Sequence, residues 1–254
     1  MDEDSLLGLA EDLARQAAAA ILAVRAGGFE VERKRDASPV TAADRIAEVL
    51  ILDGLREATP AIPVVAEEEA EAGLAGGPAA MMWLVDPLDG TRDFAAGRDH
   101  FTVNIGLLRE GRPWLGVLAV PVTGEVFSGI VGRGAWRTDG AGRTPIRART
   151  VPPGGATVLT SFHGRGDPRI EAFLADRKVA EVRPMGSAEK FCRIAEGTGD
   201  LYPRFGTTME WDTAAGEALV VAAGGRVQDW SGATLPYGKP GWRNPGFLAL
   251  GAAG

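Results

Sequence analysis

One stretch of the chain constrains the fold more than any other: residues 83–97, WLVDPLDGTRDFAAG, where an apolar run ends in two acids. Asp86 and Asp89 stand three residues apart at the end of a strand whose apolar residues predict that it is buried. A single aspartate there could be a turn residue or a helix cap, because its side chain hydrogen-bonds nearby backbone groups. Two aspartates, with Pro87 stiffening the bend, predict a cation site.

The composition leaves few classes of protein open. Of the 254 residues, 45% are hydrophobic and 24% are charged, so the chain can bury a sizeable core in one large domain or two small ones. The helix expected at 4–25 carries Glu11, Asp12 and Arg15, so we expect neither a signal peptide nor a transmembrane segment. A formal net charge of -7 argues against nucleic acid as a partner but allows local basic pockets for a small anion.

Cysteine and histidine are too scarce to build a metal site. Cys192 is the single cysteine, and His100 and His163 are the two histidines. A single cysteine excludes an internal disulfide, which fits a protein of the reducing cytoplasm, and peripheral membrane association stays open. Cys192 itself is expected to be a small core residue. Any metal must be held mainly by oxygen, and Mg²⁺ is the ion that prefers carboxylate, carbonyl and phosphate oxygens.

Helix and strand patterns alternate along the chain without a fixed repeat. A helix is predicted at 41–58, behind a cap at Thr41 or Ser38. Its apolar side chains recur at helical spacing: Ile46, Val49, Leu50 and Leu55. Strands are expected at 62–66 and 82–85, several more in an antiparallel or mixed sheet across 101–140, and a domain boundary at 149–157.

Beyond that boundary, strand and helix patterns continue to alternate. The expected elements are a strand at 158–161, a helix at 170–176, a strand at 179–182, a helix from Ser187 and a helix at 212–223. This pattern predicts an α/β fold of alternating helix and sheet layers, an α+β sandwich in two lobes that span residues 1–150 and 151–254.

Several acids stand where strands end or helices begin. They are Asp44, Glu67, Asp86, Asp89 and Asp212. Each alone has a structural explanation, either helix capping or, for the run 67–69, a charged segment in solvent. We favour solvent exposure for Glu68 and Glu69. The whole set matches the oxygen ligands that Mg²⁺ requires, with the Leu88 carbonyl turned inward by Pro87.

The motifs around these acids resemble those of the magnesium-dependent, lithium-sensitive inositol monophosphatase superfamily. AEE, WLVDPLDGT and WDTAAG occur in the expected order, and the resemblance extends over nearly the whole chain. It is strongest to the bacterial 3'(2'),5'-bisphosphate nucleotidases, through SPVTAAD, KFCRIAEGTGDLYPRFG and WDTAAGEALVVAAGG. GSAEK replaces the commoner GSSLK, and Ala66 stands where relatives often have Gly or Ser, which bears on substrate preference.

The resemblance assigns roles to matching positions. It implies two or three Mg²⁺ ions, with metal ligands Glu67, Asp86, Asp89, Asp212 and the Leu88 carbonyl. It also implies that Asp44 and Thr91 pair to orient the attacking water, and that Glu67 belongs to the catalytic set. Most of these ligands fall in the lobe 1–150, whereas Asp212 and the substrate contacts fall in the lobe 151–254.

Cationic and hydroxyl side chains predict where the substrate binds. Gly90 and Thr91 are expected to begin a helical turn whose peptide N–H groups receive the reacting phosphate, with Gly90 allowing a close approach. Ser187 and Lys190, three apart on a predicted helix, and Arg204 in a strand suit a second phosphate. The alternative for Lys190 is a solvated helix lysine.

The resemblance supports those three residues and adds two further contacts. His163 is implied to contact the adenine or ribose, against the alternative of a loop histidine without a role, and Asp212 is counted among the substrate contacts. Inositol-type relatives carry an acid near the position of Arg204, and this chain does not.

Three functions are consistent with the sequence. The leading hypothesis is a nucleotidase that converts adenosine 3',5'-bisphosphate to AMP and phosphate, in sulfur metabolism. The second is an inositol or sugar phosphate phosphatase with the same chemistry. The third is a catalytically silent protein that binds metal and nucleotide, which the presence of every implied site residue disfavours. We expect a small phosphate ester as the partner and a monomer or homodimer.

Overall fold

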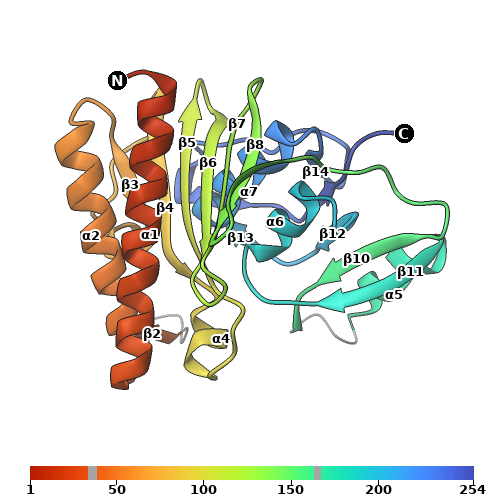
Figure 1. Cartoon of the computed structure of the whole chain (residues 1–254), viewed down its shortest axis with the longest axis horizontal. Helices are drawn as coiled ribbons and strands as arrows, with labels where there is room; N and C mark the ends of the chain where they lie inside the picture. The colour runs from red at the N-terminus through yellow and green to blue at the C-terminus, as the bar shows by residue number, and fades with distance from the viewer. Residues whose placement is uncertain (34–38, 163–166) are drawn as a thin grey trace.

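The computed structural model describes residues 1–33, 39–162 and 167–254 (Figure 1). Its helices are α1 (Glu3–Gly27), α2 (Ala42–Ala58), α3 (Glu67–Glu71), α4 (Thr91–Ala95), α5 (Pro168–Ala175), α6 (Glu189–Ala195) and α7 (Glu210–Ala222). Its strands are β1 (Val31–Arg33), β2 (Pro39–Thr41), β3 (Val64–Ala66), β4 (Met81–Asp89), β5 (Thr102–Arg109), β6 (Arg112–Val120), β7 (Glu125–Ile130), β8 (Gly134–Asp139), β9 (Gly142–Ile146), β10 (Ala156–Thr160), β11 (Val179–Pro184), β12 (Leu201–Arg204), β13 (Thr208–Met209), β14 (Arg226–Asp229), β15 (Arg243–Asn244) and β16 (Phe247–Leu250).

Layers of helices and sheets alternate across the molecule (Figure 1). Helices α1 and α2 cover one face of a seven-stranded sheet of order β3-β4-β5-β6-β7-β8-β9. Helix α7 packs on the other face, beside α6. A five-stranded sheet of order β11-β10-β12-β16-β14 follows, and α5 covers its outer face through Phe173. The predicted alternation of layers is therefore confirmed.

The register of the large sheet is interrupted where the two aspartates lie. Strand β3 runs parallel to β4, and the remaining neighbours from β4 to β9 are antiparallel. Asp86 lies opposite Asn104 and Asp89 opposite Thr102, with an irregularity between the two pairs. Because Pro87 has no N–H to donate to the ladder, the strand bends there and turns its last residues away from regular pairing.

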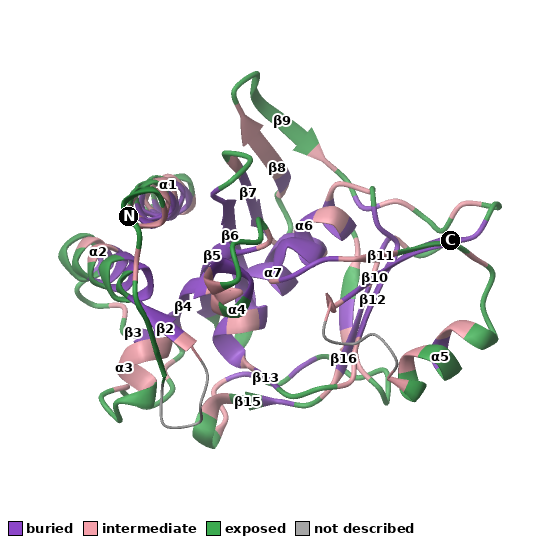
Figure 2. Ribbon diagram, turned by 90° about the horizontal axis from the view of Figure 1, so that it is seen from below, coloured by how far each residue is buried: buried purple, intermediate pink, exposed green. Residues whose placement is uncertain are grey.

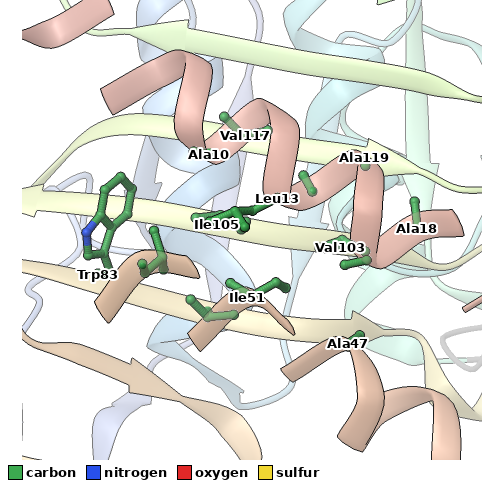
Figure 3. Close-up of a cluster of buried hydrophobic side chains, with 14 of the residues drawn as sticks. Ala10, Leu13, Ala18, Ala47, Ile51, Trp83, Val103, Ile105, Val117 and Ala119 are labelled. Carbon is green, nitrogen blue, oxygen red and sulfur yellow. The ribbon is translucent and has the colours of Figure 1, made fainter. Parts of the chain in front are cut away.

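The core between the first two helices and the large sheet combines alanines and larger aliphatic residues of the helices with mainly β-branched and aromatic residues of the strands (Figure 3). The labelled residues are Ala10, Leu13 and Ala18 of α1, Ala47 and Ile51 of α2, and Trp83, Val103, Ile105, Val117 and Ala119 of the sheet. The alanines let the helices approach the sheet closely enough for its β-branched residues to fill the interface.

Helix α2 has the predicted extent, but only two of its four apolar residues singled out from the sequence face the core. Thr41 is the cap, and its side chain accepts a hydrogen bond from the Ala43 N–H. Leu55 is fully buried and Leu50 packs against the core, whereas Ile46 and Val49 are 46% and 59% exposed. Asp44 and Glu48 are buried. The prediction was wrong for Ile46 and Val49 because hydrophobicity alone gives no signal that two acids face inward.

A row of glycines across the large sheet fixes the position of α7. Gly106, Gly116 and Gly129 lie side by side on β5, β6 and β7. A Cβ atom on Gly116 would lie 2.1 Å from the Ala215 carbonyl oxygen, and one on Gly106 would lie 2.8 Å from the Ala215 nitrogen. Only glycine permits this approach, so the row forms a groove in which α7 lies with its N-terminus toward the end of β4.

Burial is deepest in the middle of the molecule (Figure 2). Helix α7 is buried along most of its length, whereas α5 exposes most of its residues. Cys192 of α6 is buried, and this burial raises the pKa of its thiol well above the usual value, so it is the inert core residue expected. None of the helices described is long and apolar enough to cross a membrane.

Candidate active site

A pocket of about 380 Å³ opens where the end of β4, the start of α6, strand β12 and the start of α7 converge. Its lining includes eight residues singled out from the sequence: Glu67, Asp89, Gly90, Thr91, Ser187, Lys190, Arg204 and Asp212. Three other predicted residues, Asp44, Asp86 and Leu88, are buried and do not line the pocket. The chain thus brings residues more than 140 positions apart in the sequence around one hollow.

The end of β4 is held by its own backbone. The Asp86 Oδ1 atom accepts a hydrogen bond from the Leu88 N–H at 3.0 Å, across the bend at Pro87. The Leu88 side chain is buried in the core beneath α1 and α2, while its carbonyl oxygen lies 3.0 Å from the Thr91 hydroxyl. The carbonyl therefore faces the start of α4, and its predicted role as a metal ligand stays a prediction.

Asp44 and Thr91 form the pair that the resemblance implied. The Thr91 Oγ1 atom lies 2.9 Å from Asp44 Oδ1 and 3.0 Å from the Leu88 oxygen. The other oxygen of Asp44 accepts hydrogen bonds from the N–H and the hydroxyl of Thr41, both at 2.8 Å. Because Thr91 has one hydroxyl proton, it can donate to only one of its two acceptors at a time, and its lone pairs remain available to a donor in the pocket.

Three carboxylates from separate elements face one another across the pocket. Burial raises the pKa of Asp212 well above its usual value, and the negative charges of Asp89 and Glu67 raise it further. Burial also raises the pKa of Asp89, against the opposing effects of the Lys190 charge and the Ala188 N–H. Such mutual repulsion among acids in a dry site is relieved by a cation.

The acidic side chains alone do not form a complete metal-coordination site in the described part of the chain. Within the described ranges, no three Asp, Glu, His or Cys side chains are close enough together to hold an ion. Asp89 instead accepts a hydrogen bond from the Ala188 N–H at 2.5 Å, and Asp212 accepts one from the Met209 N–H at 2.7 Å. These bonds hold one oxygen of each carboxylate at the pocket wall.

A buried amide next to the acids supports the fit to a hydrated cation. The Asn104 side chain lies against Asp89 and lowers the pKa of that carboxyl. Neither its amide nitrogen nor its amide oxygen makes a hydrogen bond of normal geometry with the described residues. A buried amide is costly without partners, and such a group commonly binds an ordered water or an ion's hydration shell. The donor set is entirely oxygen and amide, which suits Mg²⁺.

The opposite wall of the pocket carries the positive charges. The Lys190 ammonium is buried, donates to the carbonyl oxygens of Met185 at 3.1 Å and Ser187 at 2.6 Å, and lies 4.9 Å from the centre of the Tyr202 ring. Burial lowers the pKa of Lys190 to about 8, although the Asp89 charge opposes this shift. The alternative of a solvated lysine is therefore wrong. Arg204, at the end of β12, lines the same pocket.

Ser187 lines the pocket, but not on a helix as expected. Helix α6 begins at Glu189, and Ser187 precedes it with a φ of 50°, in the left-handed region. The predicted helical face shared with Lys190 therefore does not exist. The two residues are joined instead because the lysine ammonium binds the Ser187 carbonyl. The sequence could not indicate this turn, since serine rarely adopts positive φ.

Two glycines let the two walls meet. Gly90 has a φ of 99°, and a Cβ atom there would lie 2.8 Å from the His100 carbonyl oxygen. A Cβ atom on Gly186 would lie 2.7 Å from the same oxygen and 2.1 Å from an Asp93 carboxylate oxygen. The loop after α4 is thus wedged between the acid wall and the turn that carries Ser187, and any larger residue would push them apart.

The acids after Glu67 differ from expectation. Glu69 is only partly exposed and pairs with Arg56 at 2.6 Å, so it is not a freely solvated acid. The backbone N–H groups of Glu68 and Glu69 bind the carboxylate of Glu48, at 2.9 and 3.1 Å. Sequence analysis missed Glu48 because a glutamate in mid-helix gives no signal that it is buried. Asn104 on β5 and Tyr202 on β12 were missed because nothing in a strand pattern indicates which of its residues lie next to the site. His163 lies outside the described residues.

Comparisons with known proteins agree with this geometry. The Inositol monophosphatase family matches residues 2–248. The 3'(2'),5'-bisphosphate nucleotidase CysQ of Salmonella typhimurium is 44% identical over 92% of this chain and 95% of that protein, and its Escherichia coli K12 counterpart is 42% identical over the same shares.

Solved structures give the same answer. A crystal structure of CysQ from Bacteroides thetaiotaomicron superposes with a TM-score of 0.81 at 31% identity, covering 98% of both chains. An inositol monophosphatase from Anabaena superposes with a TM-score of 0.77 at 28% identity, covering 98% of this chain and 91% of that one. With a family match over nearly all of its length and relatives above 40% identity, the chain belongs to the inositol monophosphatase family.

Proposed function

We propose that this chain is a magnesium-dependent phosphatase that hydrolyses the 3'-phosphate of adenosine 3',5'-bisphosphate, releasing AMP and phosphate. The observation that carries the proposal is the division of one pocket into an acid wall (Glu67, Asp89, Asp212) and a basic wall (Lys190, Arg204). The first suits cations that receive a reacting phosphate, and the second suits a further anion on the same substrate. The similarity to the CysQ nucleotidases supports the choice of substrate.

The acid wall is the proposed magnesium site. Its ligands are the carboxylates of Glu67, Asp86, Asp89 and Asp212 and the Leu88 carbonyl, for two or three ions. Bound magnesium neutralises the phosphate oxygens and makes the attacking water more acidic. The Ala188 and Met209 N–H groups keep one oxygen each of Asp89 and Asp212 fixed, so that the ligands are oriented before an ion arrives.

The proton of the attacking water passes to Thr91 and Asp44. The Thr91 Oγ1 atom accepts it as the threonine proton moves toward Asp44 Oδ1, 2.9 Å away. Thr41 donates two hydrogen bonds to Asp44 Oδ2, which holds the carboxylate with Oδ1 toward Thr91. The water oxygen forms the new bond to phosphorus, and the bond to the ribose 3'-oxygen breaks. That oxygen takes up a proton from solvent to become the hydroxyl of AMP, and Asp44 returns the proton it received to solvent.

The rest of the substrate lies against the basic wall. Gly90 and Thr91 border the reacting phosphate at the start of α4, where peptide N–H groups have no partner within the helix. Arg204, Lys190 and Ser187 bind the 5'-phosphate, the arginine as a fork that can donate two parallel bonds. The adenine or ribose contact that the resemblance implies for His163 remains part of the proposal.

A substrate panel tests this function. With Mg²⁺ present, we expect the highest kcat/KM for adenosine 3',5'-bisphosphate, and much lower values for myo-inositol 1-phosphate and fructose 1,6-bisphosphate. Phosphate release is measured for each, with a chelator as the control. A preference for the inositol or sugar phosphate would replace this proposal with the second hypothesis. If the protein bound the nucleotide but hydrolysed none of the compounds, the third hypothesis, a catalytically silent binding protein, would replace this proposal.

A further inference from the structure

Glu48 is a buried acid for which the catalytic scheme above has no use. It lies on α2 one turn after Asp44, so both carboxylates project from the same face of the helix. Asp44 reaches Thr91, and Glu48 reaches α3. Its side chain is 5% exposed. A carboxylate is seldom buried this deeply unless its charge is matched by hydrogen bonds.

Within the part of the chain that the structure describes, the hydrogen bonds of Glu48 go to two peptide groups. Its Oε2 atom accepts from the Glu68 N–H at 2.9 Å, and its Oε1 atom from the Glu69 N–H at 3.1 Å. Burial raises the pKa of Glu48 to about 7, and the neighbouring charges of Glu68 and Glu69 add to the rise, while the two N–H groups oppose it. The two N–H hydrogen bonds therefore offset part of the free-energy cost of burying the Glu48 carboxylate.

Those two amides are the ones that a helix cap would bind. Ala66 is the N-cap of α3, with the extended backbone usual for a cap (φ -120°, ψ 156°), but it has no side chain to accept from the second and third residues of the helix. Glu48 supplies the missing acceptor from another helix. A five-residue helix has little stability of its own, so this external acceptor decides where it starts.

The residue that starts α3 is Glu67. It lines the pocket, and its charge acts on Asp212, another member of the acid wall. We propose that Glu48 is a positioning residue, which binds the first turn of α3 and so sets the direction in which Glu67 enters the pocket. The inference rests on the proposed function in one respect, the role of Glu67 as a ligand of magnesium.

Helix α2 then has a function that hydrophobic packing does not explain. Its inward face carries two acids one turn apart. Asp44 binds the hydroxyl of Thr91, which accepts the water's proton, and Glu48 binds the first turn of α3, the helix that begins with the metal ligand Glu67. The Arg56–Glu69 pair at 2.6 Å is a second link from α2 to α3. The same inward face buries apolar residues such as Ile51 and Leu55, whereas the rotation of the helix leaves Ile46 and Val49 exposed.

Two measurements on the full chain test the proposal. Without metal, hydrogen exchange of the Glu68 and Glu69 amides should be faster in Glu48→Ala than in wild type, with Glu48→Gln between them because it keeps one acceptor oxygen. By titration calorimetry, Mg²⁺ affinity should fall about tenfold to a hundredfold in Glu48→Ala, the usual effect of losing a group that orients a metal ligand. High Mg²⁺ should restore most of its turnover.

Two further variants separate positioning from general destabilisation. Ala66→Ser, added to Glu48→Ala, gives α3 a local cap and should recover part of both the amide protection and the Mg²⁺ affinity. Glu11→Ala removes another 5% exposed glutamate, one that pairs with Arg15 at 3.2 Å on α1, and should change neither.

The outcomes are distinguishable. Unchanged exchange in Glu48→Ala, or faster exchange with wild-type Mg²⁺ affinity, would overturn the role of Glu48. A wild-type chain that binds no Mg²⁺ would overturn the proposed function, and the exchange comparison would still decide whether Glu48 holds α3.

Discussion

The two walls of the pocket are built in different ways. The Asp89 part of the acid wall comes from one strand end, where residues 86–91 supply two aspartates, a carbonyl, a glycine and a threonine; their hydrogen bonds stay within a few residues or reach Asp44 and Ala188. Glu67 and Asp212 join this wall from α3 and α7. The basic wall is assembled from the turn before α6, from α6 and from β12, and Lys190 already uses two of its donors on carbonyl oxygens. The strand-end part of the acid wall is therefore largely fixed locally, whereas the basic wall depends on how distant segments pack.

The largest expected effect is on the acid wall. Asp89→Asn should lower activity by orders of magnitude and weaken Mg²⁺ binding, because a neutral amide replaces a carboxylate that lies between the two walls. Turnover is measured across a Mg²⁺ titration, and circular dichroism serves as the control for folding. Wild-type activity at limiting Mg²⁺ would remove Asp89 from the ligand set. Lithium should inhibit the wild-type enzyme, as the family resemblance implies.

The next effect separates chemistry from binding within the same wall. Thr91→Ala and Asp44→Asn should each lower kcat by roughly 10²- to 10⁴-fold, the range for losing a positioned proton acceptor, with KM changed less. The two effects should not add, because Thr91 acts through Asp44. Steady-state kinetics of the single and double variants measure this. If KM rises while kcat stays, the residue concerned belongs to substrate binding.

The sequence predicts the acid wall well for a physical reason. Asp86, Asp89 and Thr91 lie within six residues, so the local backbone determines their geometry, and the boundaries of α2 follow from capping and apolar spacing. Strand β4 continues four residues past its predicted end at 85. The boundaries of the other predicted elements agree to within about two residues. The two lobes divided at residue 150 stay a prediction.

The sequence could not indicate features that arise from contacts between distant segments. The glycines of β5, β6 and β7 are visible as interruptions in apolar strands, but their alignment under α7 depends on register. Glu48 is a charged residue in the middle of a helix, which its residue type alone would place in solvent, yet it is buried. Ser187 has a backbone conformation that its residue type disfavours. Each of these is a tertiary effect that overrides a local preference.

A smaller effect is expected on the basic wall. Arg204→Ala should lower kcat/KM for adenosine 3',5'-bisphosphate roughly tenfold to a hundredfold more than for a monophosphate without the second phosphate, since a charge-assisted hydrogen bond contributes about 1.5 to 3 kcal/mol. Equal losses on both substrates would mean that Arg204 supports the reacting phosphate or the fold.

Lys190 should behave differently from Arg204. Because its ammonium is buried and binds the Met185 and Ser187 carbonyls, Lys190→Ala should also lower thermal stability and disturb the Ser187 turn. Lys190→Met keeps much of the side-chain volume without the charge, and it isolates the electrostatic part. A variant with normal stability and a purely substrate-selective loss would show that Lys190 acts only as a phosphate ligand.

The smallest effect on activity is expected for Glu217, an acid buried outside the pocket, which can be compared with Asp89 at the pocket wall. Glu217 of α7 receives a hydrogen bond from the Tyr237 hydroxyl at 2.8 Å, and burial raises its pKa to about 7. A carboxyl with a raised pKa favours the folded state when protonated, so its contribution is complete below about pH 4.5 and is lost as pH rises through about 7. The change is on the order of 3 kcal/mol.

Glu217→Gln removes that titration, so the difference in unfolding free energy between variant and wild type should change between pH 4.5 and 7.5 and stay constant outside this window. Urea unfolding at closely spaced pH values measures it, and kcat at pH 7.5 should remain near that of wild type. The same replacement of a carboxylate by an amide should therefore abolish activity at Asp89 and alter only the pH dependence of stability at Glu217. A large loss of turnover in Glu217→Gln would mean that the buried contacts of α7 are coupled to Asp212, and the division between chemistry at the pocket wall and stability behind it would fail.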